Sequence, residues 1–250
     1  MRLALFSDIH SNLQAFEACL AHAHAQQITH KALLGDFVGY GGQPAETLDL
    51  ILQLHGEGAL AITGNHDRMA VIPPTENITM GSSTAQWTHE QLRPHHFDFL
   101  RQLPLTLTLE DVLIAHGSAH EPERWRYVDS EMAARSCLDA AHKDPSITHV
   151  FVGHVHRQTL YYQGTGRGLM TFTPEPGIEV PVPKHRQWVA TIGSVGQPRD
   201  GDTRAMYAIY DSEQQRLTFH RVTYDHAAAA RAIRSAGLPE YFAERLESGR

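Results

Sequence analysis

The sequence of 250 residues predicts an α/β protein, and three observations carry this prediction. Short continuous apolar runs recur through the first 152 residues, and each run stops at a polar residue or a glycine. Helical patterns separate the first of these runs. From Leu160 onward, short strand-like pieces follow one another between Gly and Pro breaks. Apolar runs without polar alternation are typical of strands that are covered on both faces.

The first three apolar runs alternate with two predicted helices. The runs at 3–6, 31–34 and 59–63 are expected strands, and the stretches 12–26 and 45–54 between them have apolar residues at helical spacing. Strands that are separated by helices pair in parallel through crossovers. We therefore expect a sheet in which these three strands point the same way.

Two later apolar runs, at 112–115 and 150–152, end at His116 and at Gly153 followed by His154. The carboxyl ends of parallel strands share one edge of a sheet, and ligands bind at that edge. We therefore expect the polar endings of all five runs to converge.

The rest of the chain predicts additional elements around this sheet. The stretch 76–103 is expected to be a helical insertion, and the pieces 188–192, 206–210 and 217–222 suit a second sheet of mixed direction. The tail over 227–247 is rich in Ala and charged residues and is expected to be helical. No linker divides the chain, so we expect a single domain over 1–250. The tail helix is a candidate for self-association, but the sequence does not establish an oligomeric state.

Composition excludes two classes of function. The chain has 21 Lys and Arg residues and a net charge of −7, so it lacks the basic clusters of proteins that bind nucleic acid non-specifically. No stretch approaches the roughly 18 apolar residues of a membrane span. The polar Ser7 and Asp8 come too early for a signal-peptide core, and Cys19 and Cys137 lack metal-type spacing. We expect a cytoplasmic protein with no membrane partner.

The residues that follow the five runs have the chemistry of a metal centre. They are Asp8, His10, Asp36, Asn65, His66, His116, His154 and His156. Carboxylates, an amide oxygen and imidazoles, without thiolates, suit divalent Mn, Fe, Zn, Ni or Co rather than a structural zinc site. Seven of these eight side chains are enough ligands for two ions if one carboxylate bridges them. Such a pair of ions can hold a hydroxide and clamp the attacking and leaving oxygens of a phosphoryl displacement.

Each of these residues also has a structural interpretation. Gly35-Asp36 is by itself typical of a turn, and the stretch 64–67 could be only a loop. Asp8 and His10 could cap the following helix, and a single His at a strand end is usually bonded to backbone. Five such endings in succession favour the metal centre.

The ordered blocks resemble one known family. Asp8-Ile9-His10, Gly35-Asp36, Gly64-Asn65-His66-Asp67, His116-Gly117 and Gly153-His154-Val155-His156 are similar to the motifs of the calcineurin-like metallophosphoesterases, over about residues 1–200. The segment 193–200, GSVGQPRD, resembles the small bacterial and archaeal phosphodiesterase branch. The resemblance implies a four-layer α/β/β/α sandwich of two mixed β-sheets flanked by helices.

The resemblance also implies roles for the site residues. One ion would be bound by Asp8, His10, Asp36 and His156, and the second by Asp36, Asn65, His116 and His154, with Asp36 bridging. His66 would protonate the leaving-group oxygen and would be oriented by Asp67. Asn65 and Arg199 are expected to bind substrate, although a solvated Arg199 is an equal alternative. The stretch 120–129 is either a wall of the site or core packing.

The function implied is a two-metal phosphodiesterase of small molecules, with cyclic nucleotides among the candidates, in which a metal-bridging hydroxide attacks phosphorus and His66 is the general acid. Tyr40 and Thr63 stand where related protein phosphatases carry arginines, which argues against a dianionic monoester. Many small phosphodiesterases have Cys at the position of His66, so a phosphomonoesterase or protein serine/threonine phosphatase is the alternative. A non-catalytic scaffold is a third hypothesis, disfavoured by the complete set of ligands.

Overall fold

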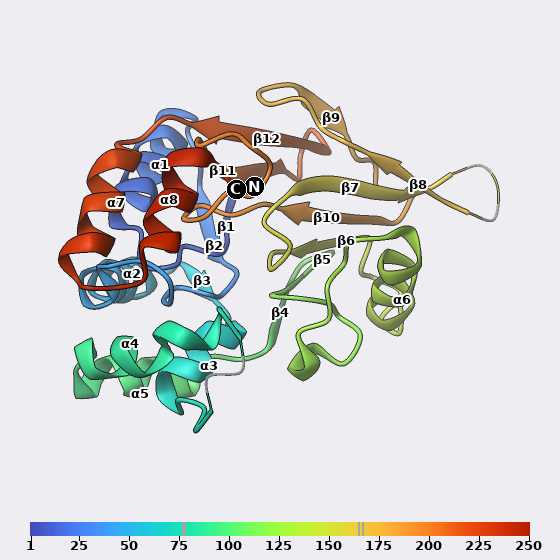
Figure 1. The fold of residues 1–250 in the computed structure, drawn as a ribbon. Coiled ribbons are helices and arrows are strands. Elements are labelled where there is room, and N and C mark those ends of the chain that lie inside the picture. The colour runs from blue at the N-terminus through green and yellow to red at the C-terminus, as the bar shows by residue number, and fades with distance from the viewer. Residues whose placement is uncertain (77–78, 165, 167) are drawn as a thin grey trace.

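Two six-stranded β-sheets packed face to face form the centre of the computed structural model, and helices cover their outer faces (Figure 1). The structure describes residues 1–76, 79–164, 166 and 168–250. The predicted four-layer α/β/β/α class is confirmed. Residues 77 and 78 of the expected helical insertion over 76–103 lie outside the described residues.

The two sheets have these strands in spatial order. The first sheet consists of β3 (Leu60–Ala61), β2 (His30–Leu33), β1 (Arg2–Phe6), β11 (Ala205–Asp211), β12 (Arg216–Val222) and β9 (Glu179–Pro181). The second sheet consists of β4 (Thr106–Leu109), β5 (Val112–Ala115), β6 (His149–Val152), β10 (Trp188–Ile192), β7 (Gln158–Gln163) and β8 (Leu169–Phe172).

The helices follow the chain in this order: α1 (Leu13–Ala25), α2 (Pro44–Gly56), α3 (Asn65–Val71), α4 (Ala85–Gln91), α5 (Pro94–Gln102), α6 (Glu131–Ala141), α7 (His226–Ser235) and α8 (Glu240–Ser248), with short 3₁₀ turns at Ser82–Thr84 and Pro122–Arg124. Asn12 begins α1, because its side chain accepts a hydrogen bond from the Ala15 N–H at 3.1 Å. The cap of this helix is therefore Asn12, and Asp8 and His10 are left for another role. Among the described residues, no helix is long and apolar enough to cross a membrane.

The five apolar runs are divided between the two sheets. Strands β1, β2 and β3 pair in parallel as predicted, but β5 pairs with β6, and β6 with β10, in the second sheet. The long, fully buried β11 and its partner β12 join the first sheet instead, where β11 runs antiparallel to β1. An apolar run reports that a strand is buried, but it does not report which open sheet edge the strand occupies.

Alternate residues of each central strand enter different layers, which explains the continuous apolar runs. In β1, Leu3 and Leu5 face the second sheet, whereas Ala4 and Phe6 face the helices. The helices α1, α2, α7 and α8 cover the outer face of the first sheet, and α6 covers that of the second (Figure 1). Because the two sheets share the core between them, the ends of β1 and β6 lie close together.

Candidate metal centre

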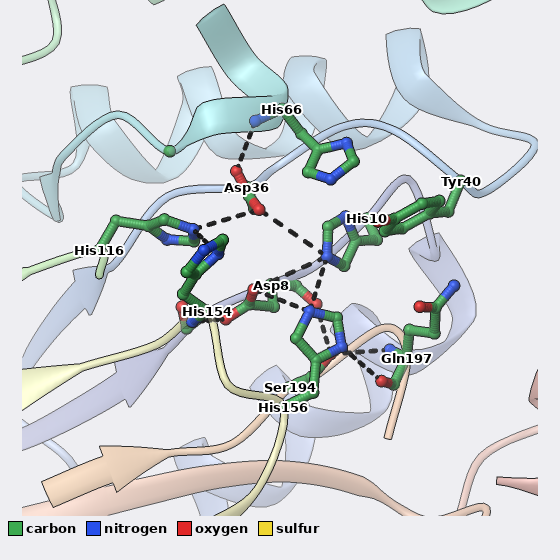
Figure 2. Close-up of polar contacts among 12 residues, drawn as sticks. Asp8, His10, Asp36, Tyr40, His66, His116, His154, His156, Ser194 and Gln197 are labelled. Atoms are coloured by element: carbon green, nitrogen blue, oxygen red, sulfur yellow. Dashed lines mark hydrogen bonds and ion pairs between the residues drawn. The ribbon is translucent and has the colours of Figure 1, made fainter. Parts of the chain in front are cut away.

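The polar residues that follow β1, β2, β5 and β6 meet at one place between the two sheets, next to the first turn of α3 (Figure 2). Direct hydrogen bonds join the loops that carry them. The Asp8 N–H donates to the Gly35 carbonyl at 3.1 Å, and the His154 N–H donates to Asp8 Oδ2 at 2.8 Å. The second of these bonds joins the first sheet to the second. The convergence expected from the sequence therefore occurs, but across two sheets rather than along one edge.

Backbone carbonyls orient three of the imidazole rings. Nδ1 lies 3.1 Å from the Val38 oxygen in His10, 2.7 Å from the Leu34 oxygen in His116, and 2.7 Å from the Gln197 oxygen in His156. A carbonyl oxygen only accepts, so Nδ1 carries the proton in each ring. In the neutral ring this leaves an unprotonated Nε2, which is the tautomer that binds metal ions.

These Nε2 atoms point at one another and at carboxylate oxygens. His10 Nε2 lies 3.1 Å from His156 Nε2, and His156 Nε2 lies 3.0 Å from Asp8 Oδ1. On the other side, His116 Nε2 lies 3.1 Å from Asp36 Oδ2. Acceptor atoms at such distances repel one another unless positive charge lies among them. The arrangement therefore calls for protons or cations at this point.

Two buried oxygen atoms without hydrogen-bond partners in the part of the chain that the structure describes indicate that cations, rather than protons alone, suit this point. Within the described ranges, Asp8 Oδ1 and Asn65 Oδ1 are buried and have no hydrogen-bond partner. A buried polar atom without a partner is costly, and structures rarely leave one without a reason. Asp8 Oδ1 lies 3.0 Å from His156 Nε2, and Asn65 lines the cavity beside these residues. The residues present thus fit divalent ions that accept mixed oxygen and nitrogen ligands.

The ligand atoms fall into overlapping groups whose members lie within 4.8 Å of one another. The groups are Asp8, His10 and His156; Asp8, Asp36, His116 and His154; and His10, Asp36 and His66. Asp36 Oδ2 lies 3.1 Å from His116 Nε2 and 4.0 Å from His10 Nε2, so it sits between the first two groups. Asp8 belongs to both of these groups as well. The geometry thus offers two carboxylates between the candidate ion positions, where the sequence suggested one.

Strained backbone is concentrated in the same residues. Left-handed φ angles occur at five of the expected ligands, namely Asp8 (53°), His10 (50°), Asp36 (52°), His154 (64°) and His156 (59°). Each such residue costs on the order of 1 to 3 kcal/mol and persists only where its surroundings force it. Close approach of loops also explains one glycine, because a Cβ on Gly153 would lie 1.8 Å from Ser7 Oγ.

The electrostatics of the centre favour bound positive charge. Burial opposes ionisation of Asp8 and Asp36, yet nearby histidines hold the pKa of both carboxyl groups below its ordinary value. Burial also opposes protonation of His116, but the Asp36 carboxylate raises its pKa to about 10. By contrast, burial lowers the pKa of His154 and His156 to about 4, so both rings are neutral at pH 7, the state in which imidazole can bind a metal ion.

The carboxylate of Asp67 is bonded to backbone in this structure. The Asp67 carboxylate accepts from the backbone N–H groups of Asp36, Phe37 and Gly64, each at 2.8 Å. Asp67 therefore anchors the loop that carries Asp36, and no hydrogen bond joins its carboxylate to the imidazole of His66 among the described residues. Burial and the charge of Asp36 raise the pKa of Asp67 to about 7.

The His66 ring is held by its aromatic neighbours. It packs 4.4 Å from the Tyr40 ring and 4.9 Å from the His10 ring, centroid to centroid. Burial lowers its pKa to about 3, so the ring is neutral at pH 7 in this structure. A bound anion would raise that pKa, because it stabilises the charged imidazolium.

A cavity of about 460 Å³ opens beside these residues, and this volume is suited to a small-molecule ligand. Its walls include Asp36, Asn65, His66, His154 and His156 from the centre, together with Tyr40, Tyr127, Arg199, Tyr241, Phe242 and Arg245. The stretch 120–129, for which the sequence left a wall of the site and core packing as alternatives, contributes Tyr127 to the cavity. The Tyr127 ring stacks on His154 at 4.1 Å with an interplanar angle of 9°. Arg199 faces the same space.

The sequence did not identify several residues in or beside this cavity. Gln197 lies in the segment 193–200 and contacts the cavity residue Arg199, but no sequence pattern assigned a task to its side chain. Tyr241, Phe242 and Arg245 lie on α8, whose composition signals only a charged amphipathic helix. Their position depends on how α7 and α8 pack against the first sheet, and no local pattern encodes that packing.

Comparisons with known proteins agree with this fold. The model of the calcineurin-like phosphoesterase superfamily domain matches residues 1–215. An uncharacterised protein of Methanocaldococcus jannaschii is 30% identical over 254 residues, covering 99% of this chain and 98% of that protein. The crystal structure of a metallophosphoesterase from Sphaerobacter thermophilus is 33% identical, with a TM-score of 0.87 over 100% of this chain and 99% of that one. A hypothetical protein from Pyrococcus horikoshii shares the fold at 18% identity, with a TM-score of 0.78 over 100% of this chain and 98% of that one.

Proposed function

The chain belongs to the calcineurin-like phosphoesterase superfamily, and from this premise we propose that it hydrolyses phosphodiester bonds of small molecules with two divalent ions at the centre described above. One observation carries the proposal. The Nε2 atoms of His10 and His156 and the buried Oδ1 of Asp8 meet at 3.0–3.1 Å, although the Nδ1 atoms of both rings carry the proton, and this arrangement is stable only around positive charge.

The chain's own residues would hold the ions in two overlapping sets. Asp8, His10, Asp36 and His156 form one set, and Asp36, Asn65, His116 and His154 form the other. Divalent ions bound there would supply Lewis-acid stabilisation of charge on the phosphoryl oxygens and activation of water. The carbonyl groups that fix the histidine tautomers, together with Asp67, keep the ligands in place before any ion or substrate arrives.

His66 is the proposed proton donor to the leaving-group oxygen. It is buried in the cavity wall next to Asn65, and its ring is wedged against Tyr40 and His10. A phosphate ester in the cavity would bring negative charge beside the ring and so raise its pKa. Proton donation by a positioned group typically contributes about 10² to 10⁴ in rate.

The residues at the two arginine positions of protein phosphatases support a diester over a monoester. The side chain of Thr63 is buried and its hydroxyl donates to the Gly64 carbonyl, so it is withdrawn from the cavity. The ring of Tyr40 packs between His10 and His66 and offers no charge. Neither residue replaces a guanidinium that would neutralise a dianionic monoester.

The test is an activity profile of the metal-reconstituted protein. We expect Mn²⁺-loaded protein to hydrolyse bis(4-nitrophenyl) phosphate faster than 4-nitrophenyl phosphate or a phosphoserine peptide. Asp36→Asn should lose both bound metal and activity, because this carboxylate lies between the two groups of ligand atoms. Asp98→Asn is the matched control, since Asp98 is exposed and its ion-pair partner is Arg101 on the same helix. Faster hydrolysis of the monoesters would favour the phosphatase alternative, and inactivity toward every ester class would contradict the proposal.

A further inference from the structure

Two arginine side chains in the wall of the cavity, Arg199 and Arg245, share one neutral hydrogen-bond acceptor. Gln197 Oε1 accepts from Arg199 Nε at 3.1 Å, from Arg199 Nη2 at 2.7 Å and from Arg245 Nη1 at 3.2 Å. The Nε atom of Arg245 is buried without a hydrogen-bond partner in the described part of the chain. Arg199 follows the segment 193–197, whereas Arg245 comes from the C-terminal helix α8.

The two guanidinium groups are like charges with no anion between them. Neither has a carboxylate at ion-pair distance among the residues that the structure describes, and the amide oxygen of Gln197 carries only a partial charge. Burial and the charge of Arg199 lower the pKa of Arg245, which reflects this repulsion. An anion that contacts both groups would relieve the repulsion and would satisfy the unpartnered Nε.

Aromatic rings hold both guanidinium groups beside the cavity. The Arg245 guanidinium lies 4.9 Å from the centroid of the Tyr241 ring, and that of Arg199 lies 5.7 Å from the Tyr40 ring. A guanidinium on an aromatic face retains free N–H groups at its edge, in the fork that matches two phosphate oxygens. The pair is thus pre-organised for bidentate binding of an anion.

Gln197 also fixes the position of the pair relative to the candidate metal centre. Its side chain holds the two arginines, and its backbone carbonyl accepts the Nδ1–H of His156 at 2.7 Å. Gln197 is buried, and its own N–H donates to Ser194 Oγ at 2.8 Å, so its placement is rigid. A ligand at the metal centre and a ligand at the arginine pair would therefore be neighbours.

We propose that Arg199 and Arg245 form a clamp for a second phosphate group of the substrate, next to the scissile one. This inference rests on the proposed function, in which divalent ions already neutralise the single charge of a phosphodiester. The positive charges of the Arg199 and Arg245 guanidinium groups exceed what the single negative charge of such a substrate needs. They match the two negative charges of an additional phosphate group. The preferred substrates are then small organic phosphodiesters that carry another phosphate, and α8 is a wall of the substrate site.

The first measurement compares two esters that differ only in that phosphate. Thymidine 5′-(4-nitrophenyl phosphate) and its 3′-phosphorylated form are assayed with the Mn²⁺-loaded full chain. We expect kcat/KM to be about tenfold higher for the 3′-phosphorylated ester, as two charge-assisted hydrogen bonds allow. In Arg245→Met this ratio should fall to about one, and in Arg245→Lys to an intermediate value. Arg231→Met is the matched control, because Arg231 is exposed on α7 and pairs only loosely with Asp225.

The second measurement needs no turnover. Calorimetric titration of the metal-free chain with thymidine 3′,5′-bisphosphate should show binding that weakens about tenfold in Arg245→Met and depends less steeply on salt. Gln197→Glu gives an independent variant if Arg245→Met fails to fold. Its carboxylate would occupy the place of the anion between the two guanidinium groups, so the preference should disappear in both measurements.

The two measurements separate this inference from the proposed function. If neither ester is hydrolysed while binding still depends on Arg245, the arginine pair binds phosphate but the proposed function is wrong, and the assignment of that phosphate to a substrate is overturned with it. If both esters are hydrolysed with equal efficiency and the variants change nothing, the proposed function stands and the clamp is overturned. Binding of the bisphosphate that is equal in wild type and Arg245→Met would also overturn the clamp.

Discussion

Replacement of Gly196 by alanine should displace the loop that carries Asp8 and His10. A Cβ at this position would lie 1.8 Å from the carbonyl oxygen of Ile9 and 2.6 Å from its carbonyl carbon, whereas real Cβ atoms essentially never come within 3.0 Å of such neighbours. The obstacle is backbone, so no side-chain rotation can relieve the overlap. The two segments would have to separate by more than 1 Å.

The cost follows from what holds those segments together. The Gly196 N–H donates to the Asp8 carbonyl at 2.9 Å, and the Gly196 carbonyl accepts from Asn12 Nδ2 at 2.8 Å. Forcing a methyl group into a packed interior costs about 1 to 3 kcal/mol. Each weakened hydrogen bond adds about 0.5 to 1.5 kcal/mol. We therefore expect the free energy of unfolding to fall by about 2 to 5 kcal/mol, a large fraction of the stability of a typical domain.

Urea unfolding of the metal-free protein measures this cost without a contribution from metal binding. Gly56→Ala is the matched control, because Gly56 is the last residue of α2 and a Cβ there meets nothing within 4 Å. Its free energy of unfolding should stay equal or rise by up to about 1 kcal/mol. A Gly196→Ala protein that unfolds at the urea concentration of the wild type would refute the packing argument and, with it, the supporting role of the segment 193–197.

Three further predictions test other parts of the site and fold. His66→Ala should retain bound metal but lose about 10² to 10⁴ in rate on alkyl esters and much less on nitrophenyl esters, whose leaving group needs no proton; equal losses on both would exclude a proton donor. Asp67→Asn should lower the free energy of unfolding at pH 8 by about 1 to 3 kcal/mol, since at least one buried N–H of the Asp36 loop loses its acceptor; an unchanged value would contradict the anchoring role. Although burial opposes it, backbone N–H groups and Arg2 hold the pKa of Asp211 below its ordinary value. Its contribution to stability should therefore be complete above about pH 4 and lost as pH falls further, so unfolding curves of Asp211→Asn between pH 2 and 6 should depend less on pH than those of the wild type.

The strands could be predicted from the sequence because burial on both faces leaves a local signal. The predicted runs 112–115 and 188–192 coincide with β5 and β10. The assignment of strands to sheets could not be predicted. β1 has two open sides, and the strand that fills the second side, β11, lies about 200 residues away. Pairing over that distance depends on the complete topology.

The candidate ligands could be predicted because their chemistry is in the residue types and their convergence follows from strand ends. The tautomers of the candidate histidine ligands could not be predicted. They depend on backbone carbonyl groups such as that of Val38, and a residue of any type could supply such a carbonyl. The role of Asp67 was assigned from the resemblance, and the structure shows its carboxylate bonded to backbone. No sequence pattern predicted that Arg245 lines the cavity, because a charged residue on an amphipathic helix is usually solvated.

The charges of the site form two zones, and their order limits what can bind. The inner zone consists of the buried carboxylates of Asp8 and Asp36 and of imidazole lone pairs, and it attracts cations. The outer zone consists of the guanidinium groups of Arg199 and Arg245, and it attracts anions. A phosphate group placed between bound ions and this outer zone would contact positive charge on both sides. Because Gln197 ties the two zones together, a substrate whose anionic groups match their spacing gains from both at once, and a neutral ligand gains from neither.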